Sequence, residues 1–96
     1  MNNVSLIGRL TRDPEMRYTA SGTAIVNFTL AINRPFKDEN GNEQADFINC
    51  VAFGKRAETI ANYVKKGNRF GVTGRIQTGS YENKEGQRVY TTDVAV

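Results

Sequence analysis

Apolar and polar residues alternate in five short runs along this chain of 96 residues. The clearest run places Val26, Phe28, Leu30 and Ile32 on one face, with polar side chains such as Asn27 and Thr29 on the other. Alternation with a period of two is typical of strands that bury one face. The pattern predicts five strands, at Val4–Leu10, Val26–Ile32, Asp46–Phe53, Phe70–Ile76 and Val89–Val96.

The segment Lys55–Lys66 breaks this alternation and has helical spacing instead. Its apolar residues recur at intervals of three and four, at Ala57, Ile60, Ala61 and Val64. Such spacing gives a helix one apolar face. Glu58 near the start, Lys65 and Lys66 at the end and Gly67 as C-cap suit the two ends of a helix.

Two turn signals separate strands in the predicted order. Asn40-Gly41 favours a tight two-residue hairpin between the second and third strands. Lys84-Glu85-Gly86 predicts a hairpin between the fourth and fifth strands, and Phe36 and Tyr81 lie five residues before the two turn glycines. We therefore expect each hairpin to carry one aromatic side chain on its ascending arm.

These elements predict an all-β fold with one short helix, formed by one domain over residues 1–96. Five strands with a helix between the third and the fourth is the order of an oligonucleotide/oligosaccharide-binding (OB-fold) barrel. In such barrels strands two and three, with their flanking loops, form the ligand face. Fold alone does not give function, so the side chains must be considered.

Composition argues against most kinds of catalytic or metal site. The chain has no histidine and a single cysteine, Cys50, so neither a zinc cluster nor an internal disulfide is expected. No phosphate-binding loop and no nucleophile–base pair is evident. Acidic residues do flank the first hairpin, but acidic hairpin tips usually only keep a loop solvated; they are Asp38, Glu39, Glu43 and Asp46. We expect no enzyme activity, no metal and no cofactor.

No apolar run is long enough for a membrane span, and the first residues lack the layout of a signal peptide. A cytoplasmic protein is therefore expected. Thirteen Lys and Arg against ten Asp and Glu give a net charge of +3, which suits a polyanionic partner without identifying one.

The aromatic side chains indicate what that partner is. Phe47 and Phe53 share one face of the third strand, and Ile48, Cys50 and Ala52 share the other. Both faces are apolar, so the alternation alone leaves open which one is buried. Cations at Lys55 and Arg56 favour outward phenylalanines that form one surface with Phe36 and Tyr81. Exposed rings stack on the bases of single strands while cations follow the phosphates.

The residues expected to bind nucleic acid are thus four aromatics and a set of cations. The aromatics are Phe36, Phe47, Phe53 and Tyr81, and the cations are Arg34, Lys37, Lys55, Arg56, Lys66 and Arg75. Tyr18 and Tyr63 are expected to pack instead, and Arg9, Arg12 and Arg17 to form ion pairs around Asp13-Pro14-Glu15.

Longer motifs show a resemblance to a known family. Gly8-Arg9-Leu10, the stretch from Asp13 to Tyr18, Phe53-Gly54-Lys55 and the stretch from Tyr63 to Gly67 occur in this order. The chain thereby resembles the bacterial single-stranded DNA-binding proteins, also carried by phages and plasmids. The resemblance implies sequence-independent binding and protection of single-stranded DNA in replication, recombination and repair. It also implies a homotetramer.

The same four aromatics match the stacking residues of that family, and Lys55 and Lys66 match its strand-contacting lysines. Many relatives have tryptophan where this chain has Phe36, Phe47 and Tyr81, and basic residues where it has Gly79-Ser80. Relatives also continue into an acidic-tipped tail that recruits replication and repair proteins, and such partners are implied here if a tail follows Val96. The alternatives are an oligomeric adaptor with residual DNA binding and an RNA-binding barrel of the cold-shock kind.

Overall fold

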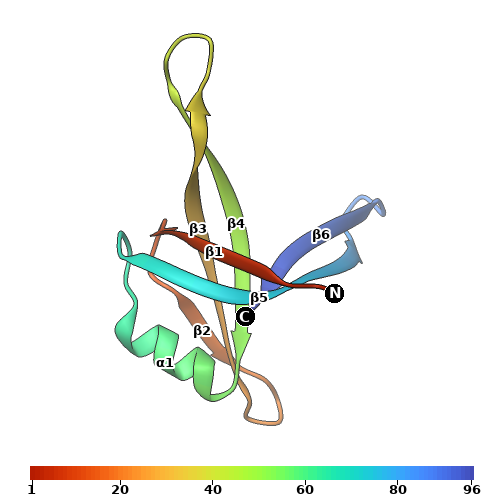
Figure 1. The fold of residues 1–96 in the computed structure, drawn as a ribbon. Helices are drawn as coiled ribbons and strands as arrows, with labels where there is room; N and C mark the ends of the chain where they lie inside the picture. Colours follow the sequence, from red (N-terminus) through yellow and green to blue (C-terminus); the bar gives the residue numbers. More distant parts are fainter.

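The computed structural model describes residues 1–96 as six strands and one helix (Figure 1). The elements follow in the order β1 (Val4–Leu10), β2 (Glu15–Tyr18), β3 (Ala24–Lys37), β4 (Glu43–Phe53), α1 (Lys55–Tyr63), β5 (Arg69–Glu82) and β6 (Arg88–Ala95). The five predicted strands are β1, β3, β4, β5 and β6. The nine-residue α1 is too short and too polar to cross a membrane.

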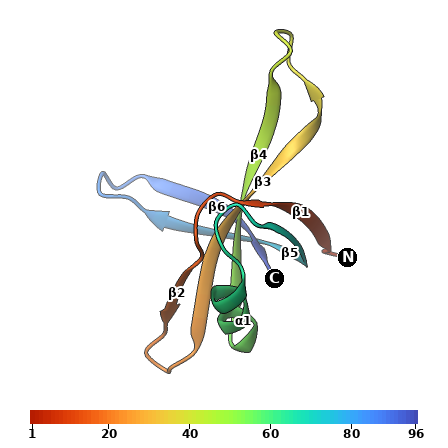
Figure 2. The ribbon, with the colours of Figure 1, turned by 90° about the vertical axis from the view of Figure 1, so that its left-hand side faces the viewer.

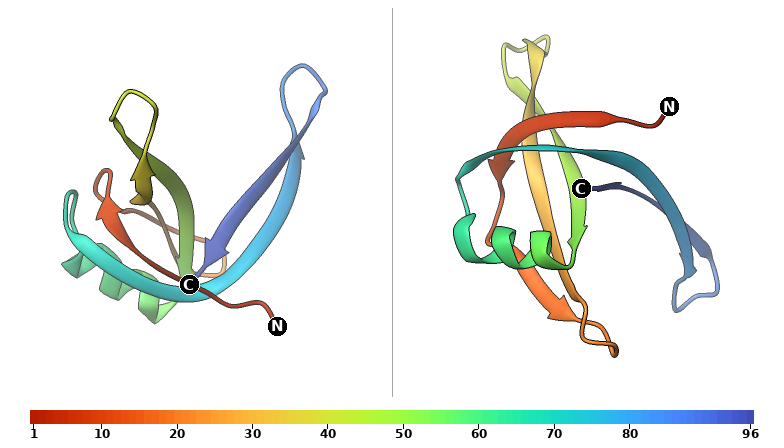
Figure 3. Two further views of the ribbon diagram at one scale, coloured as in Figure 1. Left: turned by 45° about the horizontal axis from the view of Figure 1, so that its top comes forward. Right: turned by 60° about the horizontal axis from the view of Figure 1, so that its bottom comes forward.

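The strand pairings close into a ring, which confirms the predicted barrel. The sheet order is β1-β5-β6-β4-β3-β2, and an additional β1–β3 pairing at Arg9↔Ala31 and Leu10↔Leu30 joins the two ends of the five-strand ring. All pairs are antiparallel except β4–β6, which meet in parallel only at Cys50↔Val94 and Val51↔Ala95. This short contact leaves the two long hairpins free to diverge from the barrel (Figure 3).

The prediction of five strands was short by one, because β2 pairs with β3 outside the ring. All four of its residues are exposed. Only Met16 and Tyr18 alternate with polar neighbours in a segment that directly follows Pro14, so the pattern indicated a turn. The predicted third and fourth strands are numbered β4 and β5 because β2 precedes them, and the helix lies between these two strands.

The core lies inside the ring and is closed at one end by α1. Val26, Phe28 and Leu30 of β3 point inward, as predicted, and pack against Cys50 and Ala52 of β4. Phe28 meets Phe70 edge to face, with ring centroids 5.8 Å apart. Figure 2 shows α1 and β2 at the end of the molecule opposite the tip of the β3–β4 hairpin, and Ala57 and Ile60 are the buried residues of α1.

The helix begins where it was predicted but ends three residues early. It starts at Lys55, after Gly54 with φ 68°, and its C-cap is Val64 in an extended conformation. The prediction of Gly67 as the C-cap was wrong, because its N–H donates to the Leu10 carbonyl in the turn that leads to β5. Lys65 still serves the helix end, since its Nζ donates to the Ala61 carbonyl over 3.2 Å.

Both hairpins extend well beyond the runs that periodicity had located. β3 continues to Lys37 and β5 to Glu82, where no core lies beneath them and apolar alternation stops. The predicted two-residue turn at Asn40-Gly41 was also wrong. The turn spans residues 38 to 42, with the Asp38 N–H donating to the Asn42 carbonyl and the Gly41 N–H to the Asp38 carbonyl.

Candidate nucleic-acid interface

Phe47 and Phe53 both point outward from β4. Their cross-strand partners are Ala31 and Ile25, and their exposed fractions are 67% and 47%. Cys50 and Ala52, on the opposite face, are buried. The alternative with inward phenylalanines is therefore wrong, because the ring is filled by smaller side chains from this strand and by Phe28 and Leu30 from its neighbour.

The other two aromatics project from the hairpins. Phe36 is 68% exposed near the end of β3, and Tyr81 is 55% exposed near the end of β5. All four predicted rings are thus accessible, and they are distributed over the barrel wall and both hairpin arms. A single strand of nucleic acid that meets all four must pass from the wall to the hairpins.

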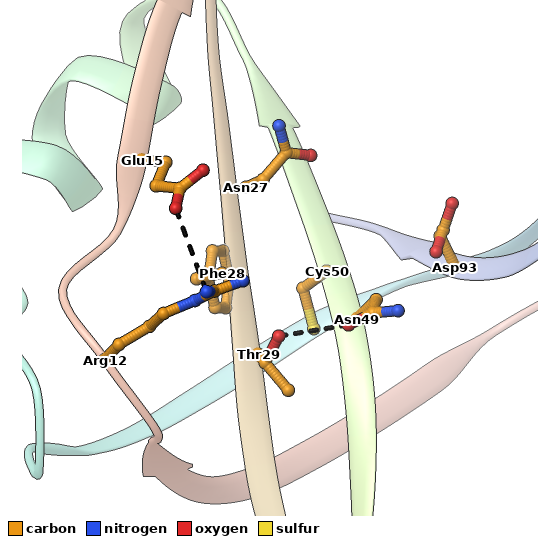
Figure 4. Close-up of a pocket in the computed structure, with 8 residues that line it drawn as sticks. All are labelled: Arg12, Glu15, Asn27, Phe28, Thr29, Asn49, Cys50 and Asp93. Carbon is orange, nitrogen blue, oxygen red and sulfur yellow. Dashed lines mark hydrogen bonds and ion pairs between the residues drawn. The ribbon is translucent and has the colours of Figure 1, made fainter.

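A polar row separates the two phenylalanines on the outer wall. Thr29 of β3 lies opposite Asn49 of β4, and its hydroxyl donates to the Asn49 Oδ1 over 3.0 Å. Asn49 and Thr29 also line a cavity of about 180 Å³ with six other residues, namely Arg12, Glu15, Asn27, Phe28, Cys50 and Asp93 (Figure 4). Sequence reasoning had placed Asn27 and Thr29 outward without assigning them to the site. Their position on the phenylalanine-bearing face follows from the strand register, which no single-strand pattern gives.

The predicted cations, unlike the rings, differ in whether their side chains already have partners in the structure. Arg34 is engaged by Asp46, whose carboxylate accepts from both Nε and Nη2. This pairing lowers the pKa of Asp46 through the hydrogen bonds from Arg34, and it raises the pKa of Arg34. Arg75 donates from Nη2 to the Gln77 Oε1 over 3.3 Å. These two guanidinium groups therefore already have partners in the free protein.

The remaining cations lie at three places. Lys37 ends β3 opposite Glu43. Lys55 and Arg56 form the start of α1 and line a groove of about 570 Å³ between the helix and β5, whereas Phe47 lines another cavity, with Ile76 and Val94. Lys66 lies in the turn after α1, where its backbone N–H donates to Asp13 Oδ1 over 2.8 Å. The remaining cations are therefore spread over the end of β3, the start of α1 and the turn that follows α1.

Several residues outside the candidate set also depart from their expected roles. Tyr63 and Tyr18, which were predicted to pack, are 77% and 58% exposed. Arg12 pairs with Glu15 at 4.0 Å, as was expected around this turn, but Arg9 donates to the Gly67 carbonyl instead. Of the acidic residues of the first hairpin, Asp38 accepts hydrogen bonds from backbone N–H groups of its own turn, and Asp46 is paired with Arg34.

Comparison with known proteins adds an independent finding. A model of the family described as "Single-strand binding protein family" matches residues 1–96. The chain is 63% identical to a single-stranded DNA-binding protein of Enterococcus faecalis and 62% identical to one of Halalkalibacterium halodurans. It is also 60% identical to one of Streptococcus pneumoniae. Each match covers 98% of this chain but only 50%, 56% and 60% of the respective relative, so the chain spans little more than half their length.

Proposed function

Because this chain belongs to the single-strand binding protein family, we propose that it binds and protects single-stranded DNA without catalysis and without regard to sequence. Its place of action is the nucleoid in the cytoplasm, during replication, recombination and repair. The observation that carries the proposal is the exposure of four aromatic rings, Phe36, Phe47, Phe53 and Tyr81, around one wall and two hairpins of a closed barrel.

Stacking accounts for the lack of sequence preference. Every base offers a flat π-face, and each base stacked on an aromatic ring is worth about 1–3 kcal/mol. Four such rings dominate the affinity without any contact to base edges. Lys55, Lys66 and Lys37 have no side-chain partner among the hydrogen bonds and ion pairs of the structure, so their ammonium groups are available to phosphates.

The proposal includes self-association, with a homotetramer as the expected assembly. β1 is hydrogen-bonded to β5 along one edge from Val4 to Arg9, but its other edge meets β3 only at Arg9 and Leu10. An unpaired edge is a liability that proteins usually cover. A second copy of the chain is the partner that closed symmetry provides. Replication and repair proteins are further partners where a tail follows the barrel.

The deciding experiment titrates the protein with oligo(dT), duplex DNA and single-stranded RNA of equal length at two salt concentrations. Oligo(dT) should bind far more tightly than duplex, whose bases are hidden. Affinity should fall with salt at a log–log slope of about −0.7 per neutralised phosphate. Equal binding of duplex and single strand would overturn stacking and favour the adaptor, and stronger binding of RNA would favour a cold-shock-like role.

Four alanine variants in the same titration separate rings from cations. Lys55→Ala and Lys66→Ala should lower both the affinity and the salt slope, because each removes a phosphate contact. Phe36→Ala and Tyr81→Ala should lower the affinity by about 1–3 kcal/mol with little change in slope. A lack of response in all four variants would contradict the proposed surface.

A further inference from the structure

The β3–β4 ladder is interrupted beside Phe36. Cross-strand pairs run without a break from Ile25↔Phe53 to Asn33↔Ala45, and the next pair is Lys37↔Glu43. Arg34, Pro35 and Phe36 thus face Gln44 alone across a bulge. Proline has no backbone N–H to donate. The arm that carries Phe36 is therefore held to β4 by backbone pairing only above and below the ring.

The Arg34–Asp46 ion pair ties the first residue of the unpaired segment, Arg34, to Asp46, which is still paired with Ile32 in the ladder. Nη2 of Arg34 lies 2.8 Å from Oδ1 of Asp46, and Nε lies 3.1 and 3.2 Å from its two carboxylate oxygens. The planar guanidinium fork fixes direction as well as distance, which a lysine does not. Asp46 immediately precedes Phe47, and Arg34 lies on the arm of Phe36. The pair therefore joins the two ring-bearing segments at the edge of the gap in the ladder.

The second hairpin shows what an uninterrupted arm looks like. The β5–β6 pairs are continuous from Arg75↔Ala95 to Glu82↔Arg88, and Tyr81 lies within them opposite Val89. Its ion pair, Glu82–Arg88 at 3.9 Å, joins residues that the backbone already holds together. Both ion pairs are exposed to a comparable degree. They differ in whether the ladder beside them is complete.

We propose that Arg34 acts through Asp46 as a positioning residue that holds Phe36 in register with Phe47, rather than as the phosphate contact that the sequence predicted. The inference rests on the proposed binding of single-stranded DNA. Its physical basis is that holding a ring in place before the strand arrives lowers the ordering cost of binding. An exposed ion pair adds little to global stability, so the effect is confined to the hairpin arm.

The test compares Arg34→Gln, Asp46→Asn and the charge-reversed pair Arg34→Asp with Asp46→Arg, and uses Glu82→Gln as the matched control. Oligo(dT) affinity is measured over a range of salt concentrations. Amide hydrogen exchange is measured in the free protein at Asp38, whose N–H donates to the Asn42 carbonyl just beyond the gap. The single variants should weaken binding about three- to tenfold, part of the contribution of one stacked ring, with the salt slope unchanged. Exchange at Asp38 should accelerate in the same variants.

The reversed pair and the control give the sharpest outcomes. Reversal should restore both slow exchange and affinity, and Glu82→Gln should resemble the parent protein. In a Phe36→Ala background, Arg34→Gln should cost no further affinity, because the two residues act through one ring. The inference would be overturned by a lower salt slope in Arg34→Gln or by tighter binding in Asp46→Asn. It would also be overturned if the reversed pair gave no rescue, or if affinity and exchange were unchanged in the single variants. Failure of the parent protein to bind oligo(dT) would overturn the proposed function instead, while hydrogen exchange would still report on the pair.

Discussion

Asp38 and Asn83 close the two long hairpins in the same way. In each turn the side-chain Oδ1 accepts hydrogen bonds from the backbone N–H groups two and four residues further along. The same residue's carbonyl accepts from the turn glycine, Gly41 or Gly86, and both glycines have a φ of 79°. The equal spacing of Phe36 and Tyr81 from the turn glycines thus reflects a repeated turn structure. In each hairpin the aromatic residue lies two positions before the residue that closes the turn.

Alanine at either position should open its own turn. Asp38→Ala and Asn83→Ala each remove an acceptor of two backbone hydrogen bonds, each worth about 0.5–1.5 kcal/mol. Amide exchange should accelerate at Asn42 in the first variant and at Gln87 in the second. Asp38→Asn is the matched control, because an amide oxygen closes the other turn already. Unchanged exchange at Asn42 in Asp38→Ala would show that the side chain does not hold the turn.

Phe28 and Phe47 should respond oppositely to truncation. Phe28→Ala empties a core site that is 4% exposed and should lower the free energy of unfolding by about 3–5 kcal/mol. Phe47→Ala should change the free energy of unfolding by less than about 1 kcal/mol, because its ring supports little core. Urea denaturation followed by circular dichroism measures both. A large loss of stability in Phe47→Ala would mean that this ring is structural.

Two glycines of β5 form a matched pair. A Cβ on Gly74 would overlap the backbone carbonyl of Ala95, whereas a Cβ on Gly71 would make only ordinary contacts, with Ile7 Cγ1 at 3.5 Å and the Leu6 carbonyl oxygen at 3.7 Å. Gly74→Ala should therefore disturb the β5–β6 pairing and cost at least about 1–3 kcal/mol of stability. Gly71→Ala should be close to neutral. Thermal unfolding of the two variants measures this difference. Equal melting temperatures would contradict the close approach of Gly74 to the Ala95 carbonyl.

Cys50 should be chemically inert in the folded chain. Burial, with a smaller contribution from the charge of Asp93, raises the pKa of its thiol to about 11 from an ordinary value of 9.0. Between these values the unfolded chain loses the proton first, so stability should fall as pH rises from about 9 to 11. Iodoacetamide at pH 8 should label Cys50 only in denaturant. Rapid labelling of the native protein would contradict its burial.

Ile7 should matter for self-association. It is 62% exposed on β1, the strand with an unpaired edge. Ile7→Lys should lower the molar mass measured by light scattering at micromolar concentration, because it places a charge in the expected contact. Tyr63→Lys changes another exposed side chain, 77% exposed at the end of α1, and should leave the mass unchanged. A monomeric parent protein would remove the assembly from the proposal.

Sequence pattern predicted the fold wherever one face of an element is buried. Val26, Phe28 and Leu30 alternate because the ring encloses them, and Ala57 and Ile60 recur because α1 covers its end. The pattern was silent where neither face is buried, which is why β2 and the outer arms of the hairpins were missed. The outward direction of Phe47 and Phe53 needed context, since both faces of β4 are apolar.

The four rings of the candidate site were identified correctly as exposed, but the role of Arg34 could not be foreseen. Its partner Asp46 lies on another strand, opposite Ile32, and their meeting depends on the register of β3 against β4. The division of the cations among separate places likewise reflects the path of the chain around the ring. Spacing along one segment contains no information on either point.

The pairing of β1 with β5 sets the order in which the chain acquires structure. Ser5 and Thr73, which face each other in this pair, are separated by 68 residues. At a synthesis rate of roughly 5–20 residues per second, β1 emerges about 3–14 s before its partner strand. The β3–β4 hairpin is complete long before that. The first strand to be made is therefore among the last to be paired, and contacts of such long sequence separation place the final step among slow folding reactions, on the order of milliseconds to seconds.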